Sequence, residues 1–161
     1  MLTAEQKKAA PWFHPVHFLS FGFGSGLLPK APGTFGSLAA LPLLWLLTDI
    51  NLMMFVIVTL VACIAGIGLC HYTAQKLQVH DHGAIVWDEI AGMLVAFIAV
   101  PLAWDTALLG FVLFRYFDIA KPSLIGVIDK RFDGGLGIMS DDIVAGLCTL
   151  GCLHIYLIFT H

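Results

Sequence analysis

The sequence predicts an all-α fold, a polytopic bundle of membrane helices. Hydrophobic residues make up 59% of the 161 positions, charged residues make up only 12%, and the mean hydropathy is +0.91. Because a soluble domain carries about 25% charged residues, an ordinary soluble protein is not expected. No polar or Pro/Gly/Ser-rich stretch is long enough to link two domains, so we expect residues 1–161 to form a single domain.

About five apolar segments are expected to build this bundle. Residues 35–48 span only about 21 Å as a helix against a hydrocarbon core of roughly 30 Å, so they are either a short or tilted crossing or a re-entrant segment. Residues 52–70 carry no charge, and residues 143–160 are interrupted only by His154. Both of these segments reach the length of a spanning helix.

Two shorter apolar segments lie between the long ones. Residues 90–104 and 106–119 are separated by Asp105 alone, which predicts a tight helical hairpin. Cytoplasmic loops collect Lys and Arg, and with five crossings all eight basic residues fall on one side. We therefore expect a multi-pass protein with residues 1–15 as a cytoplasmic N-terminal tail, an external C-terminus and the polar site on the cytoplasmic face.

Composition also limits the partners and cofactors. The net charge is −3 and no block of five or six like charges occurs, which argues against a nucleic-acid partner. The four cysteines lie in apolar runs without C-x-x-C spacing, so neither a zinc site nor a disulfide framework is expected. His80-Asp81-His82 is compact enough for a metal, but no third histidine stands at a helical spacing, so zinc is not favoured.

Two charged motifs stand at helix ends. Asp88 and Glu89 precede the segment 90–104, where stabilisation of the helix dipole is one explanation for them. Arg115, Asp118 and Lys121 are spaced i, i+3, i+6 and share one helical face. Snorkelling of the two cations, neutralised by Asp118, is the alternative, but two cations with one anion leave positive charge for a ligand such as phosphate.

A third cluster begins at Asp129 and ends at Asp142. Its glycines at 134, 135 and 137 predict a flexible turn, after which Ser140 or Asp141 would cap the last helix. Capping leaves the second aspartate unexplained. Paired aspartates at the mouth of a helix suit Mg²⁺, which takes carboxylate, water and phosphate oxygens.

The loop Ala31-Pro32-Gly33-Thr34-Phe35-Gly36-Ser37 is a candidate phosphate seat, because it leads into a helix N-terminus. It lacks the G-x-x-x-x-G-K-[ST] pattern, so no nucleotide site is predicted. A turn that simply leads into a helix explains the same residues equally well.

Four motifs taken together resemble the phosphatidylglycerophosphatase A family: APGTFGS at 31–37, VHDHGAIVWDEIAGM at 79–93, FRYFDIAKP at 114–122 and GGLGIMSDDIVAG at 134–146. The resemblance covers residues 16 to about 150, and residues 1–15 carry no matching motif. It implies an enzyme of the bacterial inner membrane that uses Mg²⁺ to convert phosphatidylglycerophosphate into phosphatidylglycerol and inorganic phosphate in phospholipid biosynthesis. The lipid substrate and the bilayer are then its expected partners.

The resemblance also implies roles for single residues. Catalytic roles fall to Asp88, Glu89, Asp118 and Asp142. Metal ligands would come from Asp81, Asp88, Glu89, Asp129, Asp141 and Asp142, and the substrate phosphate would bind Gly33, Thr34, Gly36, Ser37, Arg115 and Lys121. Lys30 and Asp133 lie outside the matching pattern.

Other phosphatase chemistries lack their residues in this chain. No cysteine stands six positions before an arginine, no acidic pair is spaced D-x-D, and the K-x6-R-P…S-G-H…H set is missing. A metal-assisted attack remains, with water or an aspartate as the nucleophile. Two other classes stay open: a transporter or ion channel that uses the interfacial charges, and a structural membrane subunit. Mg²⁺-dependent phosphate release separates the enzyme from both.

Overall fold

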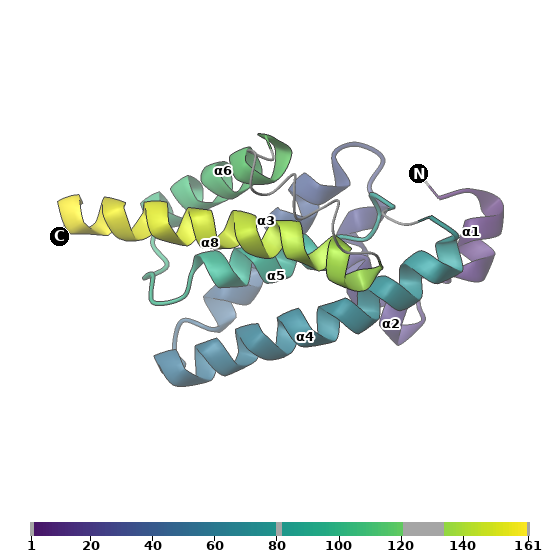
Figure 1. Ribbon diagram of the computed structural model, residues 1–161, viewed down its shortest axis with the longest axis horizontal. Helices are drawn as coiled ribbons and strands as arrows, with labels where there is room; N and C mark the ends of the chain where they lie inside the picture. The colour runs from purple at the N-terminus through teal and green to yellow at the C-terminus, as the bar shows by residue number, and fades with distance from the viewer. Residues whose placement is uncertain (1, 80–81, 121–133, 161) are drawn as a thin grey trace.

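The computed structural model describes residues 2–79, 82–120 and 134–160, which form helices and turns without a strand. Figure 1 shows α1 and the C-terminus at opposite ends of the long axis. The all-α prediction is confirmed for these residues. The described helices are α1 (Ala4–Ala9), α2 (Pro15–Ser20), the 3-10 helix η1 (Gly22–Leu27), α3 (Pro32–Leu46), α4 (Leu52–Leu77), α5 (Trp87–Ala96), α6 (Trp104–Ala120) and α8 (Gly135–Thr160).

Two of the described helices, α4 and α8, are long and apolar enough to cross a membrane. Each has 26 residues, about 39 Å of helix, against a hydrocarbon core of roughly 30 Å. Only 17% and 22% of their most apolar stretches are buried inside the protein, so most of that apolar surface faces outward. The expected count of about five crossing segments is not confirmed, because α3 has 15 residues and α5 only 10.

The two long helices start or end outside the predicted segments. Helix α4 continues past Cys70 to Leu77, and α8 begins at Gly135 rather than at Ile143. The prediction that Ser140 or Asp141 caps the last helix is therefore wrong. Both lie inside α8, where the Ser140 hydroxyl donates a hydrogen bond to the carbonyl oxygen of Gly137 at 3.1 Å. Of the three glycines predicted to form a flexible turn, two are helical.

The predicted tight hairpin around Asp105 is also wrong. Helix α5 ends at Ala96, residues 97–103 form a connection, and Asp105 lies in the first turn of α6. Ala99 adopts a left-handed backbone with φ 57°. Such a backbone and the missing N–H of Pro101 both interrupt a helix, which explains the early end of α5.

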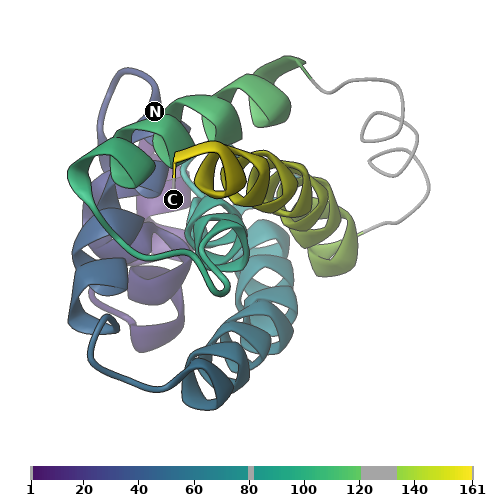
Figure 2. The same cartoon turned by 90° about the vertical axis from the view of Figure 1, so that its left-hand side faces the viewer.

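Helix α5 occupies the centre of the bundle, surrounded by α3, α4, α6 and α8 (Figure 2). Its packing against α8 is backbone to backbone. A β-carbon added at Gly92 would stand 2.6 Å from the carbonyl oxygen of Asp142, and one added at Gly146 would overlap the carbonyl oxygen of Gly92. Small residues permit such close helix contacts in membrane proteins. Two glycines therefore set the distance between the helices that carry the acidic motifs.

Within the predicted N-terminal tail, the described residues 2–15 dock on the end of α4. The Gln6 side chain donates a hydrogen bond to the carbonyl oxygen of Leu77 at 3.3 Å, and Ala10 is fully buried. In the following helix α2, Ser20 Oγ donates to the carbonyl oxygen of Leu69 at 2.9 Å. The N-terminal segment therefore covers the C-terminal end of α4.

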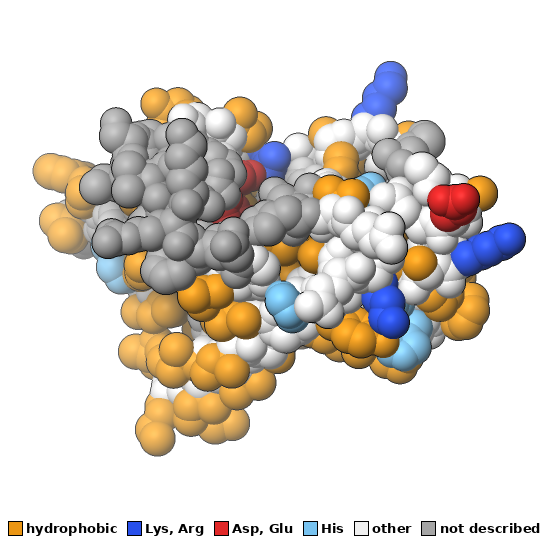
Figure 3. Space-filling view, turned by 45° about the vertical axis from the view of Figure 1, so that its right-hand side comes forward, with side chains coloured by type: hydrophobic (Ala, Val, Ile, Leu, Met, Phe, Trp, Pro, Cys, Tyr) orange, Lys and Arg blue, Asp and Glu red, His pale blue; other side chains and the backbone are white. Residues whose placement is uncertain are grey.

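Polar and apolar side chains separate along the molecule. Figure 3 shows hydrophobic side chains over its lower left part, while most of the visible Lys and His side chains lie toward its right part. At the end of α3 and the start of α6, Trp45 and Trp104 are strongly exposed. Exposed tryptophans near helix ends are typical of the boundary between membrane and water.

Candidate functional site

Three carboxylates from two helices converge at the N-terminal end of α5. Asp88 and Glu89 occupy its first turn, and Asp142 projects from α8. One ligand oxygen of each side chain lies within 4.8 Å of the others. Asp88 and Asp142 are only 7% and 3% exposed, so the group is largely shielded from water. We call these three residues the carboxylate cluster.

The glycine contact between the helices explains why the carboxylates meet. Gly92 follows Asp88 by four positions, and Gly146 follows Asp142 by four, so each glycine shares a helical face with its aspartate. Where the two glycines bring the backbones together, the aspartates one turn earlier are also brought together. The cluster is therefore a direct consequence of how α5 and α8 cross.

The cluster has the chemistry of a site for a hard divalent cation. Carboxylate oxygens are the ligands that Mg²⁺ takes in proteins. Among the described residues, Glu89 Oε2 is buried and has no hydrogen-bond partner. Buried carboxylates at such short range repel one another unless a cation or protons compensate their charge. The residues present therefore fit a magnesium ion.

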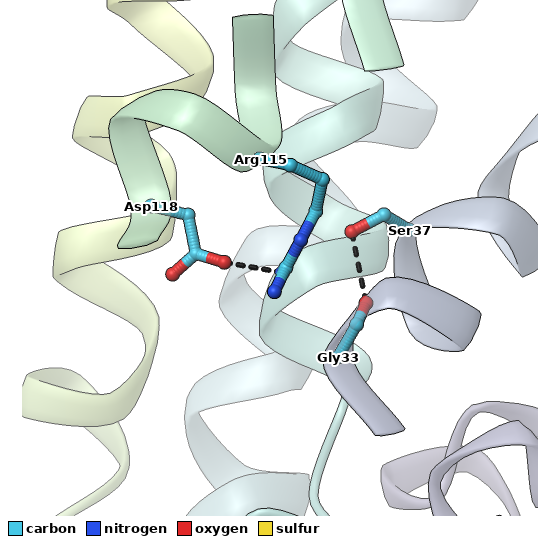
Figure 4. A network of polar contacts seen from close by, with 4 residues as sticks. All are labelled: Gly33, Ser37, Arg115 and Asp118. Carbon is cyan, nitrogen blue, oxygen red and sulfur yellow. Dashed lines mark hydrogen bonds and ion pairs between the residues drawn. The ribbon is translucent and has the colours of Figure 1, made fainter. Parts of the chain in front are cut away.

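A cation lies beside the cluster. Arg115 and Asp118, one turn apart on α6, form an ion pair, which confirms the predicted shared face for these two residues (Figure 4). The Asp118 carboxyl also interacts with Asp142. Among the described residues, the buried Nε of Arg115 has no hydrogen-bond partner. Asp118 therefore connects the guanidinium group to the carboxylate cluster.

The N-terminus of α3 completes the surroundings of the cluster. A β-carbon added at Gly33 would overlap Glu89 Oε1 and stand 3.1 Å from a guanidinium nitrogen of Arg115. The chain enters this helix through Ala31, which has a left-handed backbone with φ 47°, and no side chain caps the terminus. The first amides of a helix lack intrahelical acceptors and favour anions. The predicted role of Gly33 next to the substrate phosphate is compatible with this position.

The other predicted phosphate-binding residues of α3 have different surroundings. Gly36 lies against Val86, since a β-carbon there would stand 2.6 Å from that side chain. The buried Ser37 hydroxyl donates a hydrogen bond to the carbonyl oxygen of Gly33 at 3.0 Å (Figure 4). Thr34 is half-buried. Phosphate binding by these three residues remains a prediction, and the contacts of Gly36 and Ser37 show a packing role.

The remaining predicted ligands fall into two groups. Asp141 is buried on α8, but it is not one of the three residues whose oxygens meet. The others, Asp81, Lys121 and Asp129, lie outside the described residues.

Sequence reasoning missed the two glycines that hold the site together. A repeated sequence pattern could have identified these glycines, because residues 88–92 are DEIAG and residues 142–146 are DIVAG. An aspartate followed four positions later by glycine puts a ligand and a close-contact residue on the same helical face. The fully buried Phe114 of α6 also packs against Gly92, with ring carbons 2.6 and 2.8 Å from the same added β-carbon.

Comparison with known proteins gives a consistent set of relatives. The model of the family Phosphatidylglycerophosphatase A matches residues 18–157. Phosphatidylglycerophosphatase A of Escherichia coli is 46% identical over 149 residues, covering 92% of this chain and 84% of that protein. The enzyme of the same name from Haemophilus influenzae is 45% identical over 136 residues, covering 83% of each chain.

A third relative has a different printed substrate. A Bacteroides thetaiotaomicron protein, provisionally described as a phosphatidylinositol-3-phosphatase, is 36% identical over 149 residues, covering 85% of this chain and 89% of that protein. No solved structure matches the chain.

Proposed function

The chain belongs to the phosphatidylglycerophosphatase A family, and we propose that it hydrolyses the terminal phosphomonoester of phosphatidylglycerophosphate at the carboxylate cluster. The products are phosphatidylglycerol and inorganic phosphate. The convergence of Asp88, Glu89 and Asp142 beside the guanidinium group of Arg115 carries the proposal. The negative charge of a phosphomonoester must be compensated by positive charge. The carboxylates can hold a metal cation, and Arg115 supplies a second positive charge.

Asp88, Glu89 and Asp142 are the residues that would hold Mg²⁺. A bound magnesium ion supplies Lewis-acid polarisation of the phosphoryl group and lowers the pKa of a bound water. The burial of Asp88 and Asp142 and the buried, unpartnered Oε2 of Glu89 support this assignment. Asp81, Asp129 and Asp141 stay predicted ligands of the same ion or of a second one.

Arg115 is proposed to bind the phosphoryl oxygens. Its planar guanidinium group matches two oxygens of a phosphate at once, and its charge opposes the negative charge that builds up during phosphoryl transfer. The ion pair with Asp118 holds the side chain in place. The open amides at the start of α3, next to Gly33, would add hydrogen bonds to the same anion. Lys121 keeps its predicted role as a second cation.

Asp118 is proposed to position the attacking water or accept its proton. It interacts with both Arg115 and Asp142, so it borders the cluster without belonging to it. A general base must lie within hydrogen-bond reach of the nucleophile, and the position of Asp118 at the edge of the cluster supports this role.

The chain is a membrane protein, and we place its site at the cytoplasmic interface with five helices crossing in alternating directions. Two observations support this orientation. Asp142 lies seven residues after Gly135, about 10 Å from the start of α8, and not at its middle. Lys7 and Lys76 are exposed on α1 and at the C-terminal end of α4. By contrast, Asp49 precedes the N-terminus of α4, and Asp105 accepts a hydrogen bond from Tyr156 near the C-terminal end of α8.

The position of the carboxylates near one end of α8 argues against the transporter or channel alternative. Transporters place their ion and substrate sites near the bilayer midplane, often between broken helices. Here the carboxylates lie about 10 Å from one end of a 26-residue helix.

Phosphate release tests the proposal. Detergent-purified protein is incubated with phosphatidylglycerophosphate, with Mg²⁺ or with EDTA, beside the Asp88→Asn variant. We expect release that requires Mg²⁺ and falls at least about a thousandfold in Asp88→Asn. Asp49→Asn, which changes an acidic residue at the other end of the bundle, is the matched control. Folded wild-type protein that releases no phosphate in any condition would overturn the function, and release unaffected by EDTA would overturn the metal assignment.

A further inference from the structure

A cavity lies between the N-terminal helix α1 and the start of α3. Its volume is about 720 Å³, and its wall is built by α1, η1, the start of α3 and the loop before α5. The residues that matter for the argument are Lys7, Trp12, Leu27, Pro32, His82 and Gly83. Nothing in the proposed hydrolysis uses this cavity.

The cavity and the carboxylate cluster share the first turn of α3. Pro32 lines the cavity, and the next residue, Gly33, lies against Glu89 and Arg115. Consecutive Cα atoms are 3.8 Å apart. The cavity and the cluster are therefore both bordered by the first turn of α3.

The lining of the cavity suits an anionic amphiphile. Lys7 contributes a positive charge and His82 a polar ring, whose Nδ1 accepts the backbone N–H of Ala84 at 3.1 Å. The other described lining residues are apolar, prolines or glycines, and none of them is acidic. Positive charge next to an apolar wall matches a phosphodiester attached to hydrocarbon.

The cavity also lies at the depth of phospholipid headgroups. Helix α4 is about 39 Å long, more than the roughly 30 Å core, so its C-terminal end reaches the headgroup region. Helix α1 docks on that end through Gln6 and Leu77. Trp12 and Phe13, three and four positions after the end of α1, are 56% and 74% exposed, as expected of aromatic anchors at the membrane interface.

Two other large cavities lack these properties. One, of about 750 Å³, is lined by Leu41, Trp45 and Trp104 among others, and the second, of about 430 Å³, by Leu47 and Pro101 among others. Both lie at the far end of α3, and neither has a charged residue in its described lining.

We infer that the cavity between α1 and α3 is the subsite for the phosphodiester and the adjoining glycerol of the lipid substrate, with Lys7 supplying the positive charge. This inference rests on the proposed function. In phosphatidylglycerophosphate a glycerol unit joins the phosphomonoester to a phosphodiester, so the two anionic groups need neighbouring sites. The product phosphatidylglycerol keeps the phosphodiester and is expected to compete for the same cavity.

Two variants test the subsite. Lys7→Gln removes the charge of an exposed side chain, and we expect KM for phosphatidylglycerophosphate to rise about fivefold. Gly83→Leu fills the cavity, because the nearest atom to an added β-carbon is Pro32 Cγ at an ordinary 3.8 Å and no positive φ is required. For this variant we expect a rise in KM of about tenfold or more. The inhibition constant of phosphatidylglycerol should rise by a similar factor in each.

Matched substitutions outside the cavity are the controls. Lys8→Gln changes the neighbouring lysine, which is not in the lining, and Gly68→Leu adds the same side chain on the exposed face of α4, where no atom lies within 4 Å. Both should keep wild-type KM. Lys7→Gln and Gly83→Leu with wild-type KM and wild-type inhibition by phosphatidylglycerol would overturn the subsite. A wild type that releases no phosphate would instead overturn the proposed function.

Discussion

Glu89 of α5 lies directly against Gly33 of α3, with its carboxylate oxygen in the space that a β-carbon at position 33 would occupy. The same space borders the guanidinium group of Arg115, 3.1 Å from that position. Glycine at position 33 therefore lets a helix N-terminus, a carboxylate and an arginine meet. Gly33 and Glu89 are 56 positions apart in the sequence, and Glu89 and Arg115 are 26 apart.

Gly33→Ala is expected to reduce activity strongly while the protein stays folded. The added methyl group must displace Glu89 or Arg115, and a displacement of about 1 Å in an active site costs about a hundredfold in rate. The measurement is kcat/KM for phosphatidylglycerophosphate together with the midpoint of thermal unfolding. Gly151→Ala, at a position with no atom within 4 Å, is the control. Full activity in Gly33→Ala would show that the contact with Glu89 has no catalytic importance.

Asp142→Asn is expected to weaken metal binding directly. The substitution removes one of three converging carboxylates and keeps the size of the side chain. Titration with Mn²⁺, followed by electron paramagnetic resonance of the free ion, should show a dissociation constant about a hundredfold higher than that of the wild type. Asp49→Asn should bind as the wild type does. Equal Mn²⁺ affinity in Asp142→Asn and wild type would contradict the assigned ligand set.

Gly146→Ala is expected to lower both stability and activity. Its β-carbon would overlap the carbonyl oxygen of Gly92, so α5 and α8 must move apart, and with them Asp88 and Asp142. Overpacking of this kind costs about 1–3 kcal/mol, which corresponds to a fall of roughly 5 °C in the midpoint of thermal unfolding. Gly151→Ala on the same helix is the control. A variant with unchanged midpoint and rate would show that the helix crossing tolerates separation.

The buried His17 is expected to make the stability of the folded protein depend on pH. Burial, followed by the nearby positive charges of His14 and Lys76, lowers the pKa of His17 below its ordinary 6.5. The ring also hydrogen-bonds Thr73 Oγ1 at 3.0 Å. At a pH between the two pKa values, His17 therefore binds a proton in the unfolded chain but not in the folded protein. The stability that comes from burying the neutral ring is complete above about pH 6.5 and is lost as the pH falls toward the folded-state pKa.

The midpoint of thermal unfolding in detergent, measured at one scan rate between pH 8 and pH 5, checks this expectation. We expect the midpoint to fall on the acid side in the wild type and to fall less in His17→Gln. His154→Gln changes a histidine on α8, away from α2, and is the control. Parallel curves for the wild type and His17→Gln would show that another group dominates the acid sensitivity.

Local features of the site followed from the sequence because neighbouring residues decide them. Helical spacing predicted that Arg115 and Asp118 share a face, and the structure pairs them. The position of Asp88 and Glu89 at the head of a helix was also predicted and is confirmed. The boundaries were less accurate, because the helix that carries Asp142 continues through Gly137 and Gly135 where a turn was expected.

By itself, the sequence determined the apolar character of the chain, its helical class and the residue types that suit a metal and a phosphate. These depend on composition and on periodicity over a few turns. Tertiary structure decided which of the six candidate ligands meet, namely Asp88, Glu89 and Asp142. It also decided that Gly33 touches Glu89 and that α5 is a short central helix. Those relationships depend on how closely separate helices approach, and that distance is set by the contacts of Gly92 and Gly146 with the partner backbone, which no local pattern specifies.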